Sequence, residues 1–90
     1  VFETGILYMK MDEFESARMV FEEIENLYYD TKMIDQSRLW IVKAYARDLD
    51  LKNARKYFEK NLSMLKSSGL YIEAENEISR ASKRLKKKES

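Results

Sequence analysis

Two stretches of this 90-residue chain, residues 12–24 and 49–62, repeat one pattern. In each, an apolar residue precedes an alanine–arginine pair, and an aromatic residue stands four positions after the alanine. The matching residues, 37 positions apart, are Phe14 and Leu51, Ala17 and Ala54, Arg18 and Arg55, and Phe21 and Phe58. A lone helix pair cannot bury its own apolar face, so the repeat predicts two similar helix pairs that stack on each other.

The chain contains few residues that interrupt helices. It has no proline and only two glycines, Gly5 and Gly69, which favours long helices with short joints over a sheet protein. Apolar residues recur at steps of three and four, the spacing of a buried helical face. This spacing predicts five helices within a single domain, at about residues 1–10, 13–29, 33–47, 51–66 and 71–88.

Three residues predict where helices begin and end. Asp12 is placed to cap the second predicted helix, with Glu15 three residues later completing a capping box. Asp50 is placed to cap the fourth helix, and Gly69 to end it. The expected fold is therefore all-α: two antiparallel helix pairs and a closing helix. The pairs fall at about residues 1–30 and 33–66, and the closing helix at about 71–88.

Composition excludes several kinds of function. The chain has no cysteine and no histidine, so it has no disulfide, thiolate nucleophile, histidine base or zinc site. Its neighbouring carboxylates lie on expected solvent faces, and no glycine-rich phosphate loop is present. We therefore expect no enzymatic activity, no cofactor and no metal. A net charge of +1 gives no reason to expect nucleic acid, and no apolar run is long enough to span a bilayer.

The repeat resembles the tetratricopeptide family, whose signature has a glycine, a tyrosine three residues later, and alanine and phenylalanine on the next helix. Gly5, Tyr8, Ala17 and Phe21 occupy these positions in the first copy. The second copy has Tyr45, Ala54 and Phe58, with Val42 in place of the glycine. The resemblance implies a right-handed, tetratricopeptide-like stack of the two helix pairs with a C-terminal capping helix.

The 37-residue period is longer than the usual 34, and it resembles BamD-type outer-membrane assembly lipoproteins. The likeness covers residues 1–66, including "VFETG" (1–5), "FESARMVFEEI" (14–24) and "YYDTKMIDQSRL" (28–39). It departs at Tyr29, where the family has proline, and in carrying only two repeats. It implies a non-enzymatic scaffold of the β-barrel assembly machinery at the periplasmic face of the outer membrane. Its partners would be the barrel subunit and substrate peptides, and the resemblance also implies an upstream lipid anchor. Because the sequence opens at Val1 without an initiator methionine, we expect the natural chain to begin upstream.

A second family offers an alternative. Trp40 is similar to the tryptophan of the "YWLG" motif in periplasmic tetratricopeptide proteins associated with the Tol-Pal system. That resemblance implies a peptide-binding module outside the assembly machinery, soluble in the periplasm or cytoplasm.

Tetratricopeptide stacks present the first helix of each pair along a concave groove. Mapped onto this sequence, that geometry predicts a groove with an apolar end and a basic side, suited to a partner helix or an acidic peptide. The predicted groove residues are Phe2, Ile6, Met9, Lys10, Gln36, Leu39, Lys43, Arg47, Asn76, Arg80 and Lys83. The alternative is that these cations only solubilise the surface. The basic tail at 83–90 suits contact with lipid head groups or nucleic acid. The simpler explanation is that cations at a helix C-terminus complement the helix dipole.

Overall fold

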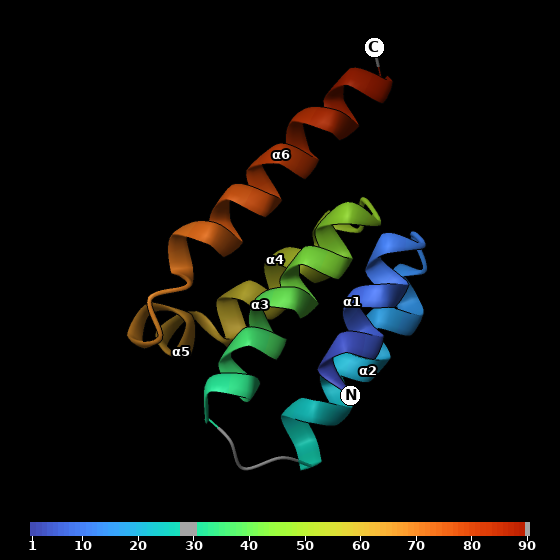
Figure 1. Ribbon diagram of the computed structural model, residues 1–90. Helices are drawn as coiled ribbons and strands as arrows, with labels where there is room; N and C mark the ends of the chain where they lie inside the picture. The colour runs from blue at the N-terminus through green and yellow to red at the C-terminus, as the bar shows by residue number, and fades with distance from the viewer. Residues whose placement is uncertain (28–30, 90) are drawn as a thin grey trace.

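The structure, a computed structural model, describes residues 1–27 and 31–89 (Figure 1). Within these ranges the chain is helical apart from short joints, and it contains no strand, which confirms the all-α class. The helices are α1 (Phe2–Lys10), α2 (Phe14–Leu27), α3 (Thr31–Arg47), α4 (Leu51–Lys60), α5 (Leu62–Ser67) and α6 (Tyr71–Glu89). The predicted extension of the second helix to residue 29, with Tyr28 and Tyr29, lies outside the described residues.

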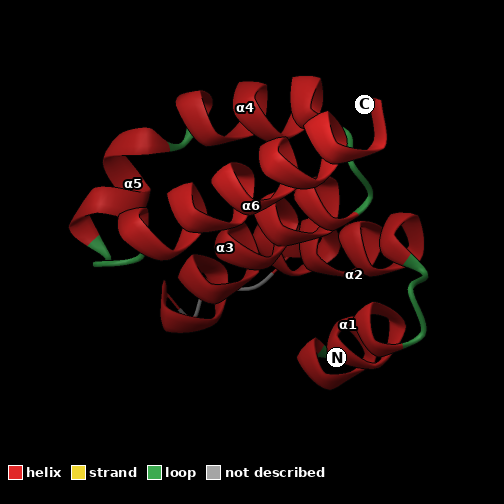
Figure 2. Ribbon diagram, turned by 90° about the horizontal axis from the view of Figure 1, so that it is seen from above, coloured by secondary structure: helices red, strands yellow, loops and turns green. Residues whose placement is uncertain are grey.

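Helix α3 is the centre of the molecule. It packs most extensively against α2, and also against α4 and α6, while α1 packs mainly on α2. Figure 2 shows the consequence: α1 and α4 lie on opposite sides, with α3 between them. Each of α2, α3 and α4 therefore packs on the helix before it, and α6 packs chiefly on α3.

The apolar side chains form two cores that share α3. The N-terminal core lies between α1, α2 and α3, and its buried members are Met9, Ala17, Phe21, Ile24, Ile41 and Ala44. The C-terminal core lies between α3, α4, α5 and α6, and its buried members are Leu39, Val42, Ala46, Ala54, Phe58, Leu65, Ala74, Ile78 and Ala81. Because α3 faces both cores, it carries apolar residues on two sides rather than along one stripe.

Three joints between helices share one backbone geometry. Asp12, Leu49 and Gly69 have φ values of 58°, 60° and 77°, in the left-handed region. After each of them, the next N–H donates to a carbonyl five residues earlier, which is the bond that closes a Schellman turn. These bonds, each 2.9 Å long, join Glu13 to Tyr8, Asp50 to Tyr45, and Leu70 to Leu65. The same turn thus starts α2, α4 and α6.

A fully buried alanine follows each turn at the same distance. Ala17, Ala54 and Ala74 stand five residues after the left-handed residue and are not exposed to solvent. Phe21, Phe58 and Ile78, four residues further on, are buried as well. Helix α6 therefore begins in the same register as α2 and α4, a third use of the pattern that the sequence shows plainly only twice.

Two predicted helix ends are confirmed and one is wrong. Asp50 caps α4, because its carboxylate accepts a hydrogen bond from the Asn53 N–H at 3.2 Å, and Gly69 follows α5 with positive φ. Asp12, however, does not cap α2. Since α2 begins at Phe14, Glu13 occupies the cap position, and Asp12 is the left-handed residue of the preceding turn.

The predicted helix 51–66 is interrupted at Asn61, which separates α4 from α5. Asn61 is buried, with φ −108° and ψ 18°. Its side-chain amide donates to the Tyr57 carbonyl at 3.0 Å, the same oxygen that accepts the Asn61 backbone N–H. Asparagine side chains compete for backbone groups in this way, and such bonds bend helices.

The left-handed turns predict opposite effects of two substitutions. Asp12→Gly removes the strain of a side chain at positive φ from an exposed position, so we expect the free energy of unfolding to rise by about 0.5–1 kcal/mol. Gly69→Ala adds a Cβ that meets no atom within 4 Å, so only the backbone strain remains, and we expect a loss of about 1 kcal/mol. Urea denaturation followed by circular dichroism measures both. If Gly69→Ala proved neutral, the left-handed geometry of this turn would be wrong.

Candidate functional site

The predicted groove residues do not form one surface. At one end, Phe2 of α1 and Gln36 of α3 line a shallow pocket of about 320 Å³ together with Glu3, Lys32 and Met33. At the other end, Arg47 of α3 and Arg80 of α6 line a separate pocket. The structure thus brings the predicted residues together in two places, one apolar and one basic.

Several members of the predicted apolar end are not available to a partner. Met9 is 5% exposed and belongs to the N-terminal core, and Leu39 is 1% exposed and belongs to the C-terminal core. Their prediction as contact residues is wrong, because each lies on the face that its helix turns inward. Ile6 is half-buried against the N-terminal core, whereas Lys10 is exposed in the last turn of α1.

Lys43 was expected on the basic side of the groove, but it is buried. Its ammonium group lies 2.6 Å from a carboxylate oxygen of Glu73 on α6, and 4.2 Å from the centre of the Trp40 ring. The carboxylate and the ring satisfy the cation, so it is not free to bind a partner. Lys43 therefore attaches α6 to α3, which is a structural role.

The basic pocket lies between α3 and α6 and has a volume of about 190 Å³. Arg47, Arg80 and Arg84 line it, together with Glu77, Ala46 and Ala81. The Glu77 side chain is 8% exposed and lies 2.9 Å from the Arg47 guanidinium and 3.7 Å from that of Arg80. Arg84 has no ion-pair partner among the residues that the structure describes.

This pocket holds three guanidinium groups and one carboxylate, so positive charge is in excess. Guanidinium groups donate paired hydrogen bonds that match the two oxygens of a carboxylate. The remaining predicted residues of α6, Asn76 and Lys83, are exposed on the same helix but do not line the pocket. The arrangement can bind an acidic side chain or a terminal carboxylate.

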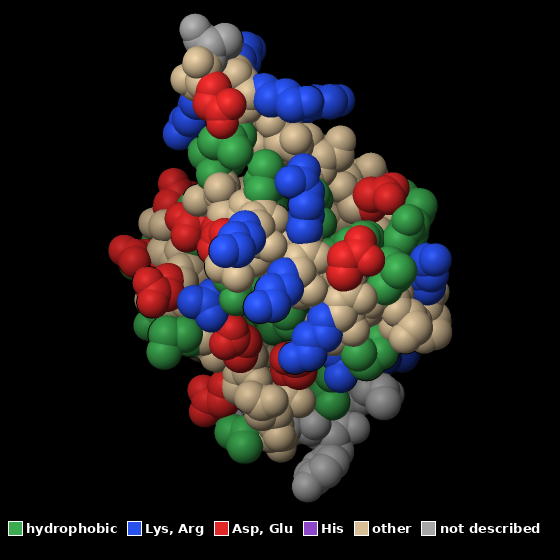
Figure 3. Space-filling view, turned by 180° about the vertical axis from the view of Figure 1, so that it is seen from behind, with side chains coloured by type: hydrophobic (Ala, Val, Ile, Leu, Met, Phe, Trp, Pro, Cys, Tyr) green, Lys and Arg blue, Asp and Glu red, His purple; other side chains and the backbone are tan. Residues whose placement is uncertain are grey.

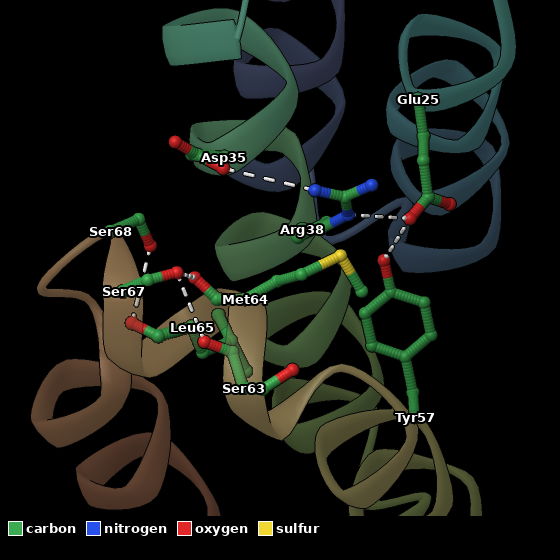
Figure 4. A network of polar contacts seen from close by, with 9 residues as sticks. All are labelled: Glu25, Asp35, Arg38, Tyr57, Ser63, Met64, Leu65, Ser67 and Ser68. Atoms are coloured by element: carbon green, nitrogen blue, oxygen red, sulfur yellow. Dashed lines mark hydrogen bonds and ion pairs between the residues drawn. The ribbon is translucent and has the colours of Figure 1, made fainter.

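A second polar cluster joins three helices (Figure 4). One carboxylate oxygen of Glu25 on α2 accepts hydrogen bonds from Arg38 of α3 at 3.1 Å and from the Tyr57 hydroxyl of α4 at 2.7 Å. Asp35 lies 3.8 Å from the same guanidinium. Burial, and the hydrogen bond to Glu25, raise the pKa of the Tyr57 phenol well above its usual value, so it stays protonated as a donor. This cluster therefore connects α2, α3 and α4.

Our sequence reasoning missed two features of the charge distribution. The carboxylates of Glu73 and Glu77, which neutralise the predicted basic side, lie 30 residues from their partners, so no local pattern reveals the pairing. The second feature was readable: residues 1–50 contain 6 basic and 11 acidic residues, and residues 51–90 contain 11 and 5. The two parts carry net charges of −5 and +6, which the overall value of +1 hides.

Comparison of the chain with protein-family models, with curated proteins and with solved structures gave no match. Among the described residues, no group of three or more acidic side chains is arranged to hold a metal ion. None of the helices at 2–27 and 31–89 is both long enough and apolar enough to cross a membrane. The function therefore has to be argued from the geometry of this chain.

Proposed function

We propose that this protein is a non-enzymatic scaffold that binds an acidic segment of a partner protein in the pocket between α3 and α6. One observation carries the proposal: three arginines line the pocket with a single carboxylate, Glu77, which pairs with Arg47 and Arg80 and leaves Arg84 without an ion-pair partner in the described part of the chain. The helices that form the pocket are held by buried contacts of the C-terminal core and by the ion pair between Lys43 and Glu73. A site that is already ordered binds without an additional entropic cost.

The proposal includes a tetratricopeptide-like stacking of two helix pairs closed by α6. Its support is the 37-residue repeat, the shared turn before α2 and α4, and the packing of α3 on the first pair. In such a stack α1, α3 and α6 face one side, which is where the two pockets are found.

The narrower role, in outer-membrane barrel assembly at the periplasmic face of the outer membrane, is proposed on the resemblance of residues 1–66 alone. In this role, the acidic partner is a soluble domain of the barrel subunit. Immobilised protein should retain such domains from solution, and the general scaffold function survives if it does not, because it requires only an acidic segment.

Charge reversal at the pocket tests the binding function. Arg80→Glu with Arg84→Glu converts the excess of positive charge into an excess of negative charge, so binding of a short glutamate-rich peptide should weaken by about tenfold or more. Both residues are exposed, so helicity should not change. Lys43 is unsuited to this test, because it is buried and a carboxylate at that position would face the carboxylate of Glu73.

A matched control has the same net charge but leaves the pocket unchanged. Arg55→Glu with Lys86→Glu alters two exposed cations, one on α4 and one on α6, that do not line it. Isothermal titration of the peptide into each variant compares them. If both variants lose affinity equally, the effect is one of net charge and the pocket is not the binding site.

A further inference from the structure

The outer faces of α2 and α4 lie on the side of the molecule shown in Figure 3. Lys and Arg side chains form a row down the middle of this view, and acidic side chains gather along one edge. The two helices both pack on α3, and they are joined near their C-terminal ends, where the Tyr57 hydroxyl of α4 donates to Glu25 of α2. They also start at the same end, since Phe14 and Asp50 line one pocket, and they therefore run in parallel.

The outer faces of these helices carry opposite charges at matching positions. Each face is a stripe of three residues spaced by four, on the side opposite the buried alanine and aromatic residue. The α2 stripe is Glu15, Met19 and Glu23, and the α4 stripe is Lys52, Lys56 and Lys60. Each residue of the first stripe is 37 positions before its counterpart in the second. The repeat that builds the core is thus preserved, while the charge on its outer face is inverted.

These side chains are free to bind. All six are exposed, and Met19 is 60% exposed. Within the described part of the chain, none of the four charged residues at 15, 23, 52 and 60 has an ion-pair partner. The ends of each stripe are about 12 Å apart, since each residue adds 1.5 Å of rise.

We propose that this face binds a second copy of the same chain in a two-fold dimer. A two-fold axis parallel to α2 and α4 places the α2 stripe of one copy against the α4 stripe of the other. Lys52 then faces Glu15 of the second copy, Lys60 faces Glu23, and symmetry repeats both contacts. The aliphatic part of Lys56 covers Met19, which removes apolar surface from water.

The pattern favours a second copy over other anionic partners. Duplex nucleic acid and anionic membranes are wider than α4 and present only negative charge. Either would bring that charge against Glu15 and Glu23 on the neighbouring helix. A second copy satisfies both stripes at once, and only the two-fold arrangement does so without leaving a charged stripe unpaired.

Sedimentation equilibrium of the whole chain tests the dimer. At low ionic strength, about 0.01 M, the wild-type protein should dimerise reversibly, and its dissociation constant should rise on the order of tenfold or more at about 1 M salt, where charges are screened. A wild-type protein that stays monomeric at millimolar concentration and low salt would overturn the proposal. So would a dimer that salt does not weaken.

Charge reversal then tests the pairing. Lys52→Glu with Lys60→Glu should weaken dimerisation by about tenfold or more, and so should Glu15→Lys with Glu23→Lys. The control Lys86→Glu with Lys88→Glu has the same net charge as the first variant, −3, but lies on the exposed end of α6, so it should still dimerise. Equal loss in the control would show a general charge effect and overturn the assignment of the face.

Two combinations of these substitutions should restore dimerisation. The two double variants are expected to be monomeric alone but to form a heterodimer when mixed. Positions 15, 23, 52 and 60 are then all acidic in one variant and all basic in the other. The quadruple variant restores every pair with reversed sense and returns the net charge to +1, so it should dimerise again. If neither recovery occurs, the two stripes do not face each other.

Discussion

Glu25→Ala is expected to lower the free energy of unfolding by about 2–3 kcal/mol. The Glu25 carboxylate binds donors from two other helices, the guanidinium of Arg38 and the hydroxyl of Tyr57. The Glu25 and Arg38 side chains are only 20% and 21% exposed, so water cannot fully replace the lost acceptor. The substitution leaves the Tyr57 hydroxyl without its acceptor and, among the described residues, it leaves Arg38 only the 3.8 Å ion pair with Asp35, where α2, α3 and α4 meet. Urea denaturation measures the loss.

Related variants separate the parts of this effect. Tyr57→Phe removes one bond and should cost about 1 kcal/mol, and Glu25→Gln keeps an acceptor without the charge and should fall between the two. Glu22→Ala is the matched control, because its 2.6 Å ion pair with Arg18 lies within α2 and should be worth about 0.3–0.5 kcal/mol. A Glu25→Ala variant no less stable than Glu22→Ala would mean that the cluster does not hold the helices together.

Local patterns predicted the helices because burial and spacing act within one helix. The stripes through Ala17 and Phe21, and through Ala54 and Phe58, describe faces that the structure buries. The turns were harder, since aspartate and leucine do not usually adopt positive φ, and only Gly69 suggests the geometry that Asp12 and Leu49 share. A sequence shows that a turn is needed there but not which residue takes the strain.

The groove was predicted less well because side-chain availability depends on distant residues. Leu39 lies on α3, which is buried from two sides, so a single apolar stripe could not distinguish its inner from its outer positions. Met9 lies on the one buried face of α1, together with Gly5. Lys43 became structural through Glu73, which arrives with a helix 30 residues later. Arg47 and Arg80, by contrast, do meet in one pocket, because both lie at the contact between α3 and α6.

Gly5→Ala is expected to destabilise the protein, although alanine normally favours helices. A Cβ at this position would lie 2.5 Å from Cε1 and 2.6 Å from Cζ of Phe21. The ring cannot move easily, because it is fully buried and packs against Phe2 at 5.3 Å and Trp40 at 6.0 Å between ring centres. Overpacking of this kind costs about 1–3 kcal/mol, and the gain in helix propensity is at most about 1 kcal/mol. The net loss should be about 1–2 kcal/mol in urea denaturation.

A smaller side chain at position 21 should relieve the clash with the added Cβ. In a double-mutant cycle, Gly5→Ala should cost less in a Phe21→Leu background, because the leucine leaves room for the added methyl group. Thr4→Ala is the control, since Thr4 is exposed on the same helix and should change stability little. Val42, 37 positions after Gly5, is fully buried, so Val42→Gly should destabilise through the lost contacts. Equal costs of Gly5→Ala in both backgrounds would show that the Phe21 ring is not the reason why residue 5 is glycine. Contact with this ring would then not explain why the first repeat has glycine where the second has valine.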